Sequence, residues 1–387
     1  MASPLTTNTP PASVERRRHG SRTRWILAAI LLLAFVLRAW NLDWDRGTHL
    51  QPDERFWSDV AANVENPDEW RWSEVLDPEK STLNPRVYKP NYVYGTLPLW
   101  ASEAAAGVLM TDTMSWAVGM IDSVGIDVAR NEPAAEPIGN RLRFNTGYDV
   151  TIIGRLMSAL IDTMTVAAVF FLARELTDDR KVGLLAALLQ SLTVLHIQYA
   201  HFLGSEPWVA FFVTCGVWGS VRLARHRGGW RTRVFTTVTI GLAIASKLSG
   251  VAAVAAPFAA LMVVIGPELG LLAKSRIPPG VLGRMARSIE PYLVMALLAV
   301  VAYRIAQPYD FQAGLSLVFN DRFTQDIDYL SDINQGGNWP WVQPLVGRTP
   351  LIHPLTQMFL WGMGPGLGFA AFFGLLRAGR RFVRGER

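Results

Sequence analysis

Apolar runs of 16–25 residues alternate with charged segments along the whole chain. A helix needs an apolar run of about this length to cross a lipid bilayer. The pattern therefore predicts an all-α polytopic membrane protein with about eight spans. These are expected at 25–41, 150–173, 182–200, 207–224, 235–248, 250–266, 291–306 and 355–376.

The distribution of basic residues predicts the orientation of the spans. Five segments, expected on the cytoplasmic side, hold 22 of the 37 Lys and Arg, whereas the longer outer segments hold 11. This bias follows the positive-inside rule and places both termini in the cytoplasm of a plasma membrane protein. The cytoplasmic segments are 1–24, 174–181, 222–234, 267–290 and 377–387, and the outer segments are 42–149, 201–206 and 307–354.

The same bias divides the chain into three parts. Residues 1–24 are expected to be a disordered basic tail, residues 25–376 a single transmembrane domain, and residues 377–387 a second basic tail. Five arginines precede the first span without a small-residue cleavage site, which is typical of a retained signal-anchor.

The charge pattern also indicates how two ambiguous apolar segments are arranged. Residues 93–110 resemble a span, but a span there would invert every later loop and place Arg225 and Arg231 outside. They are therefore expected to form an amphipathic helix on the outer surface, interrupted by Pro98 and Glu103. Residues 235–266 are expected to form two short spans that meet near Lys247–Gly250.

Composition excludes several classes of protein. Half of the residues are hydrophobic and only 18% are charged, which is unusual for a soluble protein of 387 residues. The net charge of +5 comes from cations at span ends and does not indicate nucleic-acid binding. The lone Cys215 allows neither a disulfide framework nor a thiolate metal site. The inner loops are too small for a nucleotide-binding domain.

Four cations are expected at membrane depth, toward the outer ends of their spans. An ionisable group in a span costs about 2.5–3.5 kcal/mol on insertion scales, so it usually has a partner or a function. Four such groups at one level suggest a site for an anionic headgroup. The alternative is that they reach to outer phospholipid phosphates. They are Arg38, Arg155, Lys247 and Arg304.

The segment Gln51-Pro52-Asp53-Glu54 follows the first span directly. A carboxylate at the membrane surface can accept a proton from the hydroxyl of an acceptor, which makes Asp53 and Glu54 candidates for general base catalysis. The alternative is a helix N-terminus, because Pro-Asp-Glu suits the first turn of a helix.

A second polar group lies in the short outer link 201–206. His201 and Glu206 must lie at the membrane surface there, although Ser205 and Glu206 could simply cap the next helix. Asp53, Glu54 and Glu206, with His201, could also form an oxygen-rich site for Mg²⁺ or Mn²⁺, but no fixed spacing supports one.

Three further features complete the candidate chemistry. Lys89 could bind a phosphate as a point charge, or be an ordinary solvated lysine. Asp162 lies within a span and is expected to form an interhelical hydrogen bond or ion pair. The loop 307–354 is rich in aromatic residues, Gly and Pro, which is typical of an ordered lid over a sugar or lipid, or of a plain interfacial loop.

Several of these segments, in this order, resemble the polyprenyl-phosphate-dependent membrane glycosyltransferases of the GT-C superfamily, especially protein O-mannosyltransferases and aminoarabinose transferases. The resemblance covers about residues 25–380 and depends on the order of the motifs, since none is specific alone. They are Gln51-Pro52-Asp53-Glu54, Tyr94-Gly95-Thr96-Leu97-Pro98-Leu99, Gly154-Arg155 through Asp162, His196 through Phe202, Gly241 through Ser249, Gln307 through Phe311, and Trp361 through Gly368.

The resemblance implies a GT-C-like helix bundle whose large first outer loop carries juxtamembrane helices. It implies Asp53 as the catalytic base, supported by Glu54, with Glu206 as a second acid. Lys247 and Arg155 are the implied ligands of the lipid phosphate, and Lys89 and His201 are further binding candidates. Gln51 stands where the family usually has His, and Glu206 where Asp is more usual.

The resemblance thus implies an enzyme that moves a sugar from a polyprenyl-phosphate carrier to a hydroxyl of a lipid, glycan or protein acceptor, with inversion, on the outer side. Two alternatives stay open. A non-catalytic subunit or half of a split transferase would not need Asp53, and would act with a partner membrane subunit. A transporter would instead have midplane sites and internal repeats.

Overall fold

The computed structural model describes residues 12–64, 71–109, 147–272, 278–334 and 346–384. These residues are almost entirely helical or in turns, and the only β pairing among them is an isolated bridge between Phe311 and Phe319. The predicted all-α fold is therefore confirmed.

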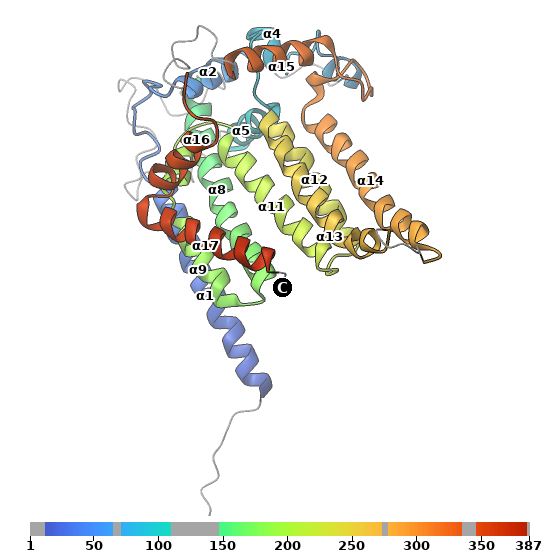
Figure 1. The fold of residues 1–387 in the computed structure, drawn as a ribbon. Helices are drawn as coiled ribbons and strands as arrows, with labels where there is room; N and C mark the ends of the chain where they lie inside the picture. Colours follow the sequence, from blue (N-terminus) through green and yellow to red (C-terminus); the bar gives the residue numbers. More distant parts are fainter. Residues whose placement is uncertain (1–11, 65–70, 110–146, 273–277, 335–345, 385–387) are drawn as a thin grey trace, which may run out of the picture.

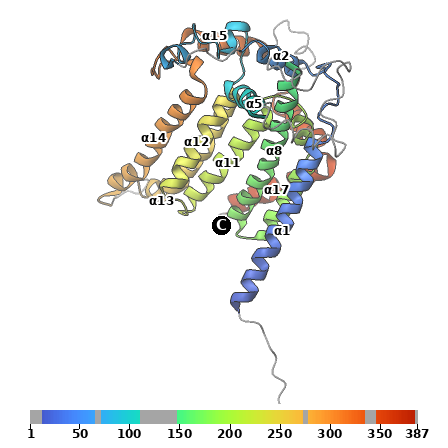
Figure 2. The ribbon, with the colours of Figure 1, turned by 180° about the vertical axis from the view of Figure 1, so that it is seen from behind.

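A bundle of long helices forms the body of the molecule (Figures 1 and 2). Neighbours in the bundle pack in the order α1, α8, α11, α12 and α14, with α9 against α1 and α8, and α13 against α11 and α14. The bounds are α1 Ala12–Ala39, α8 Gly147–Thr177, α9 Arg180–Ser191, α11 Glu206–Ala224, α12 Trp230–Ser246, α13 Ala255–Leu272 and α14 Val281–Ala306.

Within the residues that the structure describes, four segments are long and apolar enough to cross a membrane. They agree with four of the predicted spans, and of the other four those at 25–41 and 235–248 stay predictions. The segments are Val150–Thr177, Glu206–Ala224, Leu248–Leu272 and Val281–Ala306.

Two predicted spans are divided in the structure. The segment 182–200 forms α9 and a separate short helix, α10 (Val194–Tyr199). The segment 355–376 forms α16 (Ile352–Gln357), the π-helical turn η4 (Met358–Gly362) and α17 (Pro365–Val383). Single continuous helices were the wrong expectation for both segments.

Specific contacts and residues accompany each of the two breaks. The guanidinium of Arg38 donates to the carbonyls of Gln190 and Ser191, which satisfies the polar end of α9 inside the bundle. Gly364, with a φ of 81°, and then Pro365 separate η4 from α17, because the left-handed backbone suits glycine and proline cannot continue a helix.

The predicted break near Lys247–Gly250 is confirmed. Helix α12 ends at Ser246, Lys247 has an extended backbone, and the 3₁₀ helix η1 (Leu248–Val254) leads into α13. A Cβ atom on Gly250 would lie 2.2 Å from the carbonyl oxygen of Ala243, so only glycine allows the chain to turn back this closely.

Short helices cover one end of the bundle (Figure 1). Of these, α5 has 14 residues and packs against α8 and α12, with Leu99 and Ser102 fully buried. It is therefore more enclosed than the expected surface helix. The covering helices are α2 Pro52–Ala61, α3 Trp72–Val75, α4 Pro85–Tyr88, α5 Thr96–Leu109, η2 Pro308–Asp310 and α15 Asp321–Asn334.

Helix α1 begins at Ala12, so it extends into the segment 1–24 that was expected to be a disordered tail. The apolar part of the helix supplies the costly nucleus, and further residues then add at little cost. Arginine is a good helix former, which favours this extension.

Candidate active site

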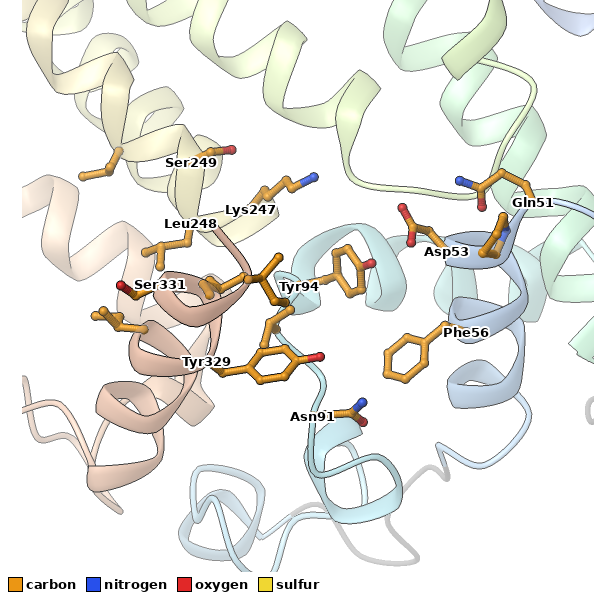
Figure 3. A pocket seen from close by; sticks show the side chains of 16 residues that line it. Gln51, Asp53, Phe56, Asn91, Tyr94, Lys247, Leu248, Ser249, Tyr329 and Ser331 are labelled. Carbon is orange, nitrogen blue, oxygen red and sulfur yellow. The ribbon is translucent and has the colours of Figure 1, made fainter. Parts of the chain in front are cut away.

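A cavity of about 1210 Å³ lies between the covering helices and the end of the bundle (Figure 3). Four elements form its wall: the start of α2, the segment before α5, the break after α12, and α15. Its polar lining residues are Gln51, Asp53, Asn91, Tyr94, Lys247, Ser249, Tyr329 and Ser331, and most of the others are aliphatic.

Asp53 faces this cavity from the first turn of α2. Its position follows from the sequence, because Pro52 begins the helix and the side chain of Gln51 caps it by accepting from the backbone N–H of Glu54. Figure 3 shows Asp53 directed toward Tyr94 and across the cavity from Lys247. The helix start and the functional interpretation of Asp53 are therefore compatible.

The hydroxyl of Tyr94 lies on the side of its ring that faces Asp53 (Figure 3). Burial raises the pKa of the Tyr94 hydroxyl, and the negative charges of Asp53 and Glu206 raise it further. The hydroxyl therefore keeps its proton and remains a hydrogen-bond donor at the edge of the cavity, near Asp53.

Glu54 lies on the other side of α2 and is fully buried. It accepts hydrogen bonds from Nε and Nη2 of Arg155, at 2.8 and 2.6 Å, and from the backbone N–H of Leu203 at 2.7 Å. Arg155 is also buried and contacts Asp45 at 2.9 Å. Neither Glu54 nor Arg155 lines the cavity, so both act in the scaffold that fixes α2 to α8.

Lys247 lines the cavity at the break between α12 and η1. Its ammonium lies 2.7 Å from a carboxylate oxygen of Glu206 and 5.9 Å from the centre of the Tyr94 ring. Glu206 begins α11, and Ser205 before it forms no side-chain capping bond. Asp53, Tyr94, Lys247 and Glu206 thus form one connected group.

Two sequence candidates lie outside this group. Lys89 forms an exposed ion pair with Asp59, at 3.2 Å. The ring of His201 contacts the carbonyl oxygens of Ile197 and Trp40, at 2.7 and 3.0 Å. Neither Lys89 nor His201 lines the cavity.

The four cations expected at membrane depth do not form one headgroup site. Arg38 is fully buried and pairs with Asp162 at 2.6 Å, as expected of Asp162. Arg304 donates to the carbonyls of Gly314 and Ser316. Because a buried cation requires compensating partners, three of the four cations are used within the bundle and only Lys247 reaches the cavity.

The carboxylates proposed for a metal do not fit one. Across the described residues there is no group of three or more His, Cys, Asp or Glu side chains that could hold an ion. Glu54 is held by Arg155 and Glu206 by Lys247, and of these three carboxylates only that of Asp53 lines the cavity. The expected trio of Asp53, Glu54 and Glu206 is therefore not assembled.

Helix α15 supplies a wall of the cavity that sequence reasoning did not assign by residue. Arg86 anchors this helix by pairing with Asp310, at 2.7 Å, and with Asp326 of α15. A lid was expected within 307–354, and α15 lies in that range, whereas residues 335–345 fall outside the described residues. No sequence motif indicated Tyr329 as a lining residue.

Gly95 allows Tyr94 to approach the end of α12. Its N–H donates to the carbonyl of Ser246 at 3.2 Å, and a Cβ atom would lie 1.8 Å from the carbonyl oxygen of Ala245. We expect Gly95→Ala to lower the free energy of unfolding by about 1–3 kcal/mol, because the backbone must shift to relieve the clash. Thermal unfolding measures this. Gly266→Ala is the control, since a Cβ there meets no atom within 4 Å, and equal stability of the two variants would contradict the close approach.

The comparisons with known proteins agree with this description in part of the chain. Residues 134–276 match the family described as dolichyl-phosphate-mannose-protein mannosyltransferase. This range includes Arg155, Glu206 and Lys247 but not Asp53. Comparison with the curated proteins gave no significant match.

Among solved structures, the chain is similar to the Archaeoglobus fulgidus oligosaccharyltransferase. Its apo form is 13% identical with a TM-score of 0.47, and the match covers 88% of this chain and 37% of that chain. Its complex with Zn and sulfate is 16% identical with a TM-score of 0.45, and covers 93% and 43%. This chain thus matches less than half the length of the archaeal enzyme.

The family match, over residues 134–276, confirms the resemblance stated from the sequence.

Proposed function

We propose that the chain is a membrane glycosyltransferase that moves a sugar from a polyprenyl-phosphate carrier to a hydroxyl acceptor, with inversion. The observation that carries this proposal is the position of Asp53 and Lys247, a base and a cation that face each other across one cavity. The cavity volume of about 1210 Å³ is large enough for a sugar and part of its carrier.

The proposed reaction uses Asp53 as general base. The carboxylate takes the proton of the acceptor hydroxyl, the oxygen attacks the anomeric carbon, and the bond from that carbon to the phosphate oxygen breaks. The carrier leaves as the lipid phosphate with both electrons of that bond. Attack opposite to the leaving group inverts the anomeric carbon.

Lys247 is the proposed partner of the departing phosphate. A fixed cation at the place where negative charge develops lowers the barrier. Its pairing with Glu206 at 2.7 Å holds the ammonium at the cavity wall before the carrier arrives. Glu206 is thus assigned as a positioning residue, and the roles first expected for Arg155, Lys89 and His201 in binding the phosphate are withdrawn.

The outer side of the membrane is the proposed location of the reaction. The cavity lies where α11 begins and α12 ends, near Glu206 and Lys247. The opposite ends of these helices carry basic residues, which the positive-inside rule places in the cytoplasm. These include Arg222, Arg225, Arg227, Arg231 and Arg233.

Sugar transfer by the purified full chain in lipid nanodiscs tests this function. Polyprenyl-phosphate sugars would be supplied as donors, with lipid, glycan and peptide hydroxyls as acceptors, with and without EDTA. We expect transfer with inversion, visible in the NMR spectrum of the product. Donor binding without any transfer would instead favour a non-catalytic subunit.

We expect Lys247→Met to lower the rate constant of transfer by about 10²–10³-fold, because the leaving phosphate loses its cation. Single-turnover kinetics with saturating donor measures this step. Lys89→Met is the matched control, since Lys89 pairs with Asp59 outside the cavity. A similar loss in both variants would contradict the assignment of Lys247.

A further inference from the structure

A second cavity, of about 310 Å³, lies between the α9–α10 break and the C-terminal helices. None of its lining residues lines the first cavity. Most of its wall is aliphatic, and three polar residues, Gln190, Thr193 and His196, lie together on the α9–α10 side. The aliphatic wall includes Leu189, Leu195, Met358, Met363 and Leu367.

Three side chains, Arg38, Asp162 and His196, form a buried relay of hydrogen bonds that ends at this cavity. Arg38 donates from Nε to Asp162 at 2.6 Å, and the other oxygen of Asp162 lies 2.6 Å from Nδ1 of His196. The Arg38 and Asp162 side chains are 0% and 1% exposed, whereas that of His196 is 28% exposed. The relay therefore presents one imidazole to the cavity.

The relay determines which polar group would bind. When the ring of His196 is neutral and Nδ1 donates its proton to Asp162, Nε2 is a hydrogen-bond acceptor. Within the described residues, no partner of Nε2 is observed. Arg38 and Asp162 cancel in charge, so an uncharged hydroxyl suits this site better than a phosphate.

The opposite wall has an unusual backbone. Residues Met358–Gly362 form a π-helical turn. This conformation is rare in proteins overall, but where it occurs it often lies at a functional site. A Cβ on Gly362 would lie 3.4 Å from the side chain of Leu195, an ordinary van der Waals contact, so this turn packs against α10. This gives a role to the glycine-rich segment 361–368, which the proposed transfer reaction does not use.

We propose that this second cavity binds a lipid alcohol. The hydroxyl donates to Nε2 of His196, and the hydrocarbon chain lies along the aliphatic wall formed by Leu195, Met363 and Leu367. Binding here does not require the proposed transfer reaction, because the two cavities share no lining residue.

Photolabelling of the full chain in nanodiscs tests the proposal without any sugar donor. The probe is a hexadecanol that carries a diazirine in its chain, with hexadecanol, hexadecyl phosphate or hexadecane as competitor. We expect label in the peptide that contains Met358–Ala371, and competition by hexadecanol only. Equal competition by hexadecyl phosphate or by hexadecane would overturn the proposal.

Two variants separate the cavity from the lipid-facing surface. Ala371→Phe fills the cavity and should reduce labelling at least fivefold, whereas Leu375→Phe, at an exposed position of the same helix, should not. His196→Phe removes the acceptor and should weaken competition by hexadecanol about fivefold, the effect of one neutral hydrogen bond. Unchanged labelling of Ala371→Phe would mean general contact with lipid and would refute the site.

Discussion

Replacing Asp53 with Asn should reduce sugar transfer by about 10²–10⁴-fold, the usual contribution of a general base. Asparagine keeps the size and can keep the contact with Tyr94, but it cannot take the proton of the acceptor hydroxyl. Donor binding should change little, because Lys247 and the aliphatic wall of the cavity remain. The comparison requires initial rates of transfer and, separately, the affinity for the donor.

Asp59→Asn is the matched control for this prediction. Asp59 lies on the same helix, α2, and its side chain is 60% exposed and pairs with Lys89. The control should transfer at the wild-type rate and unfold at the wild-type temperature. If Asp53→Asn transfers as fast as the control, Asp53 is not the base, and the proposed reaction loses its central residue.

The apolar runs predicted the helical fold because a span has a minimum length and few charges. The break after α12 could also be predicted, since only two spans fit the charge pattern around Lys247. The break between α9 and α10 could not be predicted. It depends on Arg38, which lies 152 and 153 positions away from the two carbonyls that it binds.

At the candidate active site, too, contacts between residues far apart in the sequence could not be predicted. The sequence indicated that Asp53 and Glu54 diverge, because neighbours on a helix point in different directions. It could not indicate which of them is buried, since the partner of Glu54 is Arg155, 101 positions away. The sequence signal that could have indicated Tyr94 is Gly95 beside it, because glycine often marks a close approach of two backbones.

Substitution of Arg155 tests directly whether this residue stabilises the fold or binds the lipid phosphate. Arg155→Met should lower the free energy of unfolding by about 3–5 kcal/mol, because it leaves Glu54 and Asp45 as buried carboxylates without their cation. Thermal unfolding in nanodiscs measures the change. Adding Glu54→Gln to this variant should recover part of the loss, because it removes one of the two buried charges.

The pH dependence of unfolding should weaken in the same variant. Burial alone would raise the pKa of Asp45, but the hydrogen bond and charge of Arg155, with the backbone N–H groups of Gly47 and Leu50, outweigh it and hold that pKa below its usual value. This carboxylate therefore stabilises the wild type above about pH 4, and the contribution is lost as the pH falls. Without Arg155 the pKa of Asp45 should rise toward its usual value, so the variant should lose less stability than the wild type as the pH falls through about 4. If Arg155→Met unfolds like the wild type but no longer binds the donor, Arg155 contacts the lipid phosphate and is not part of the scaffold.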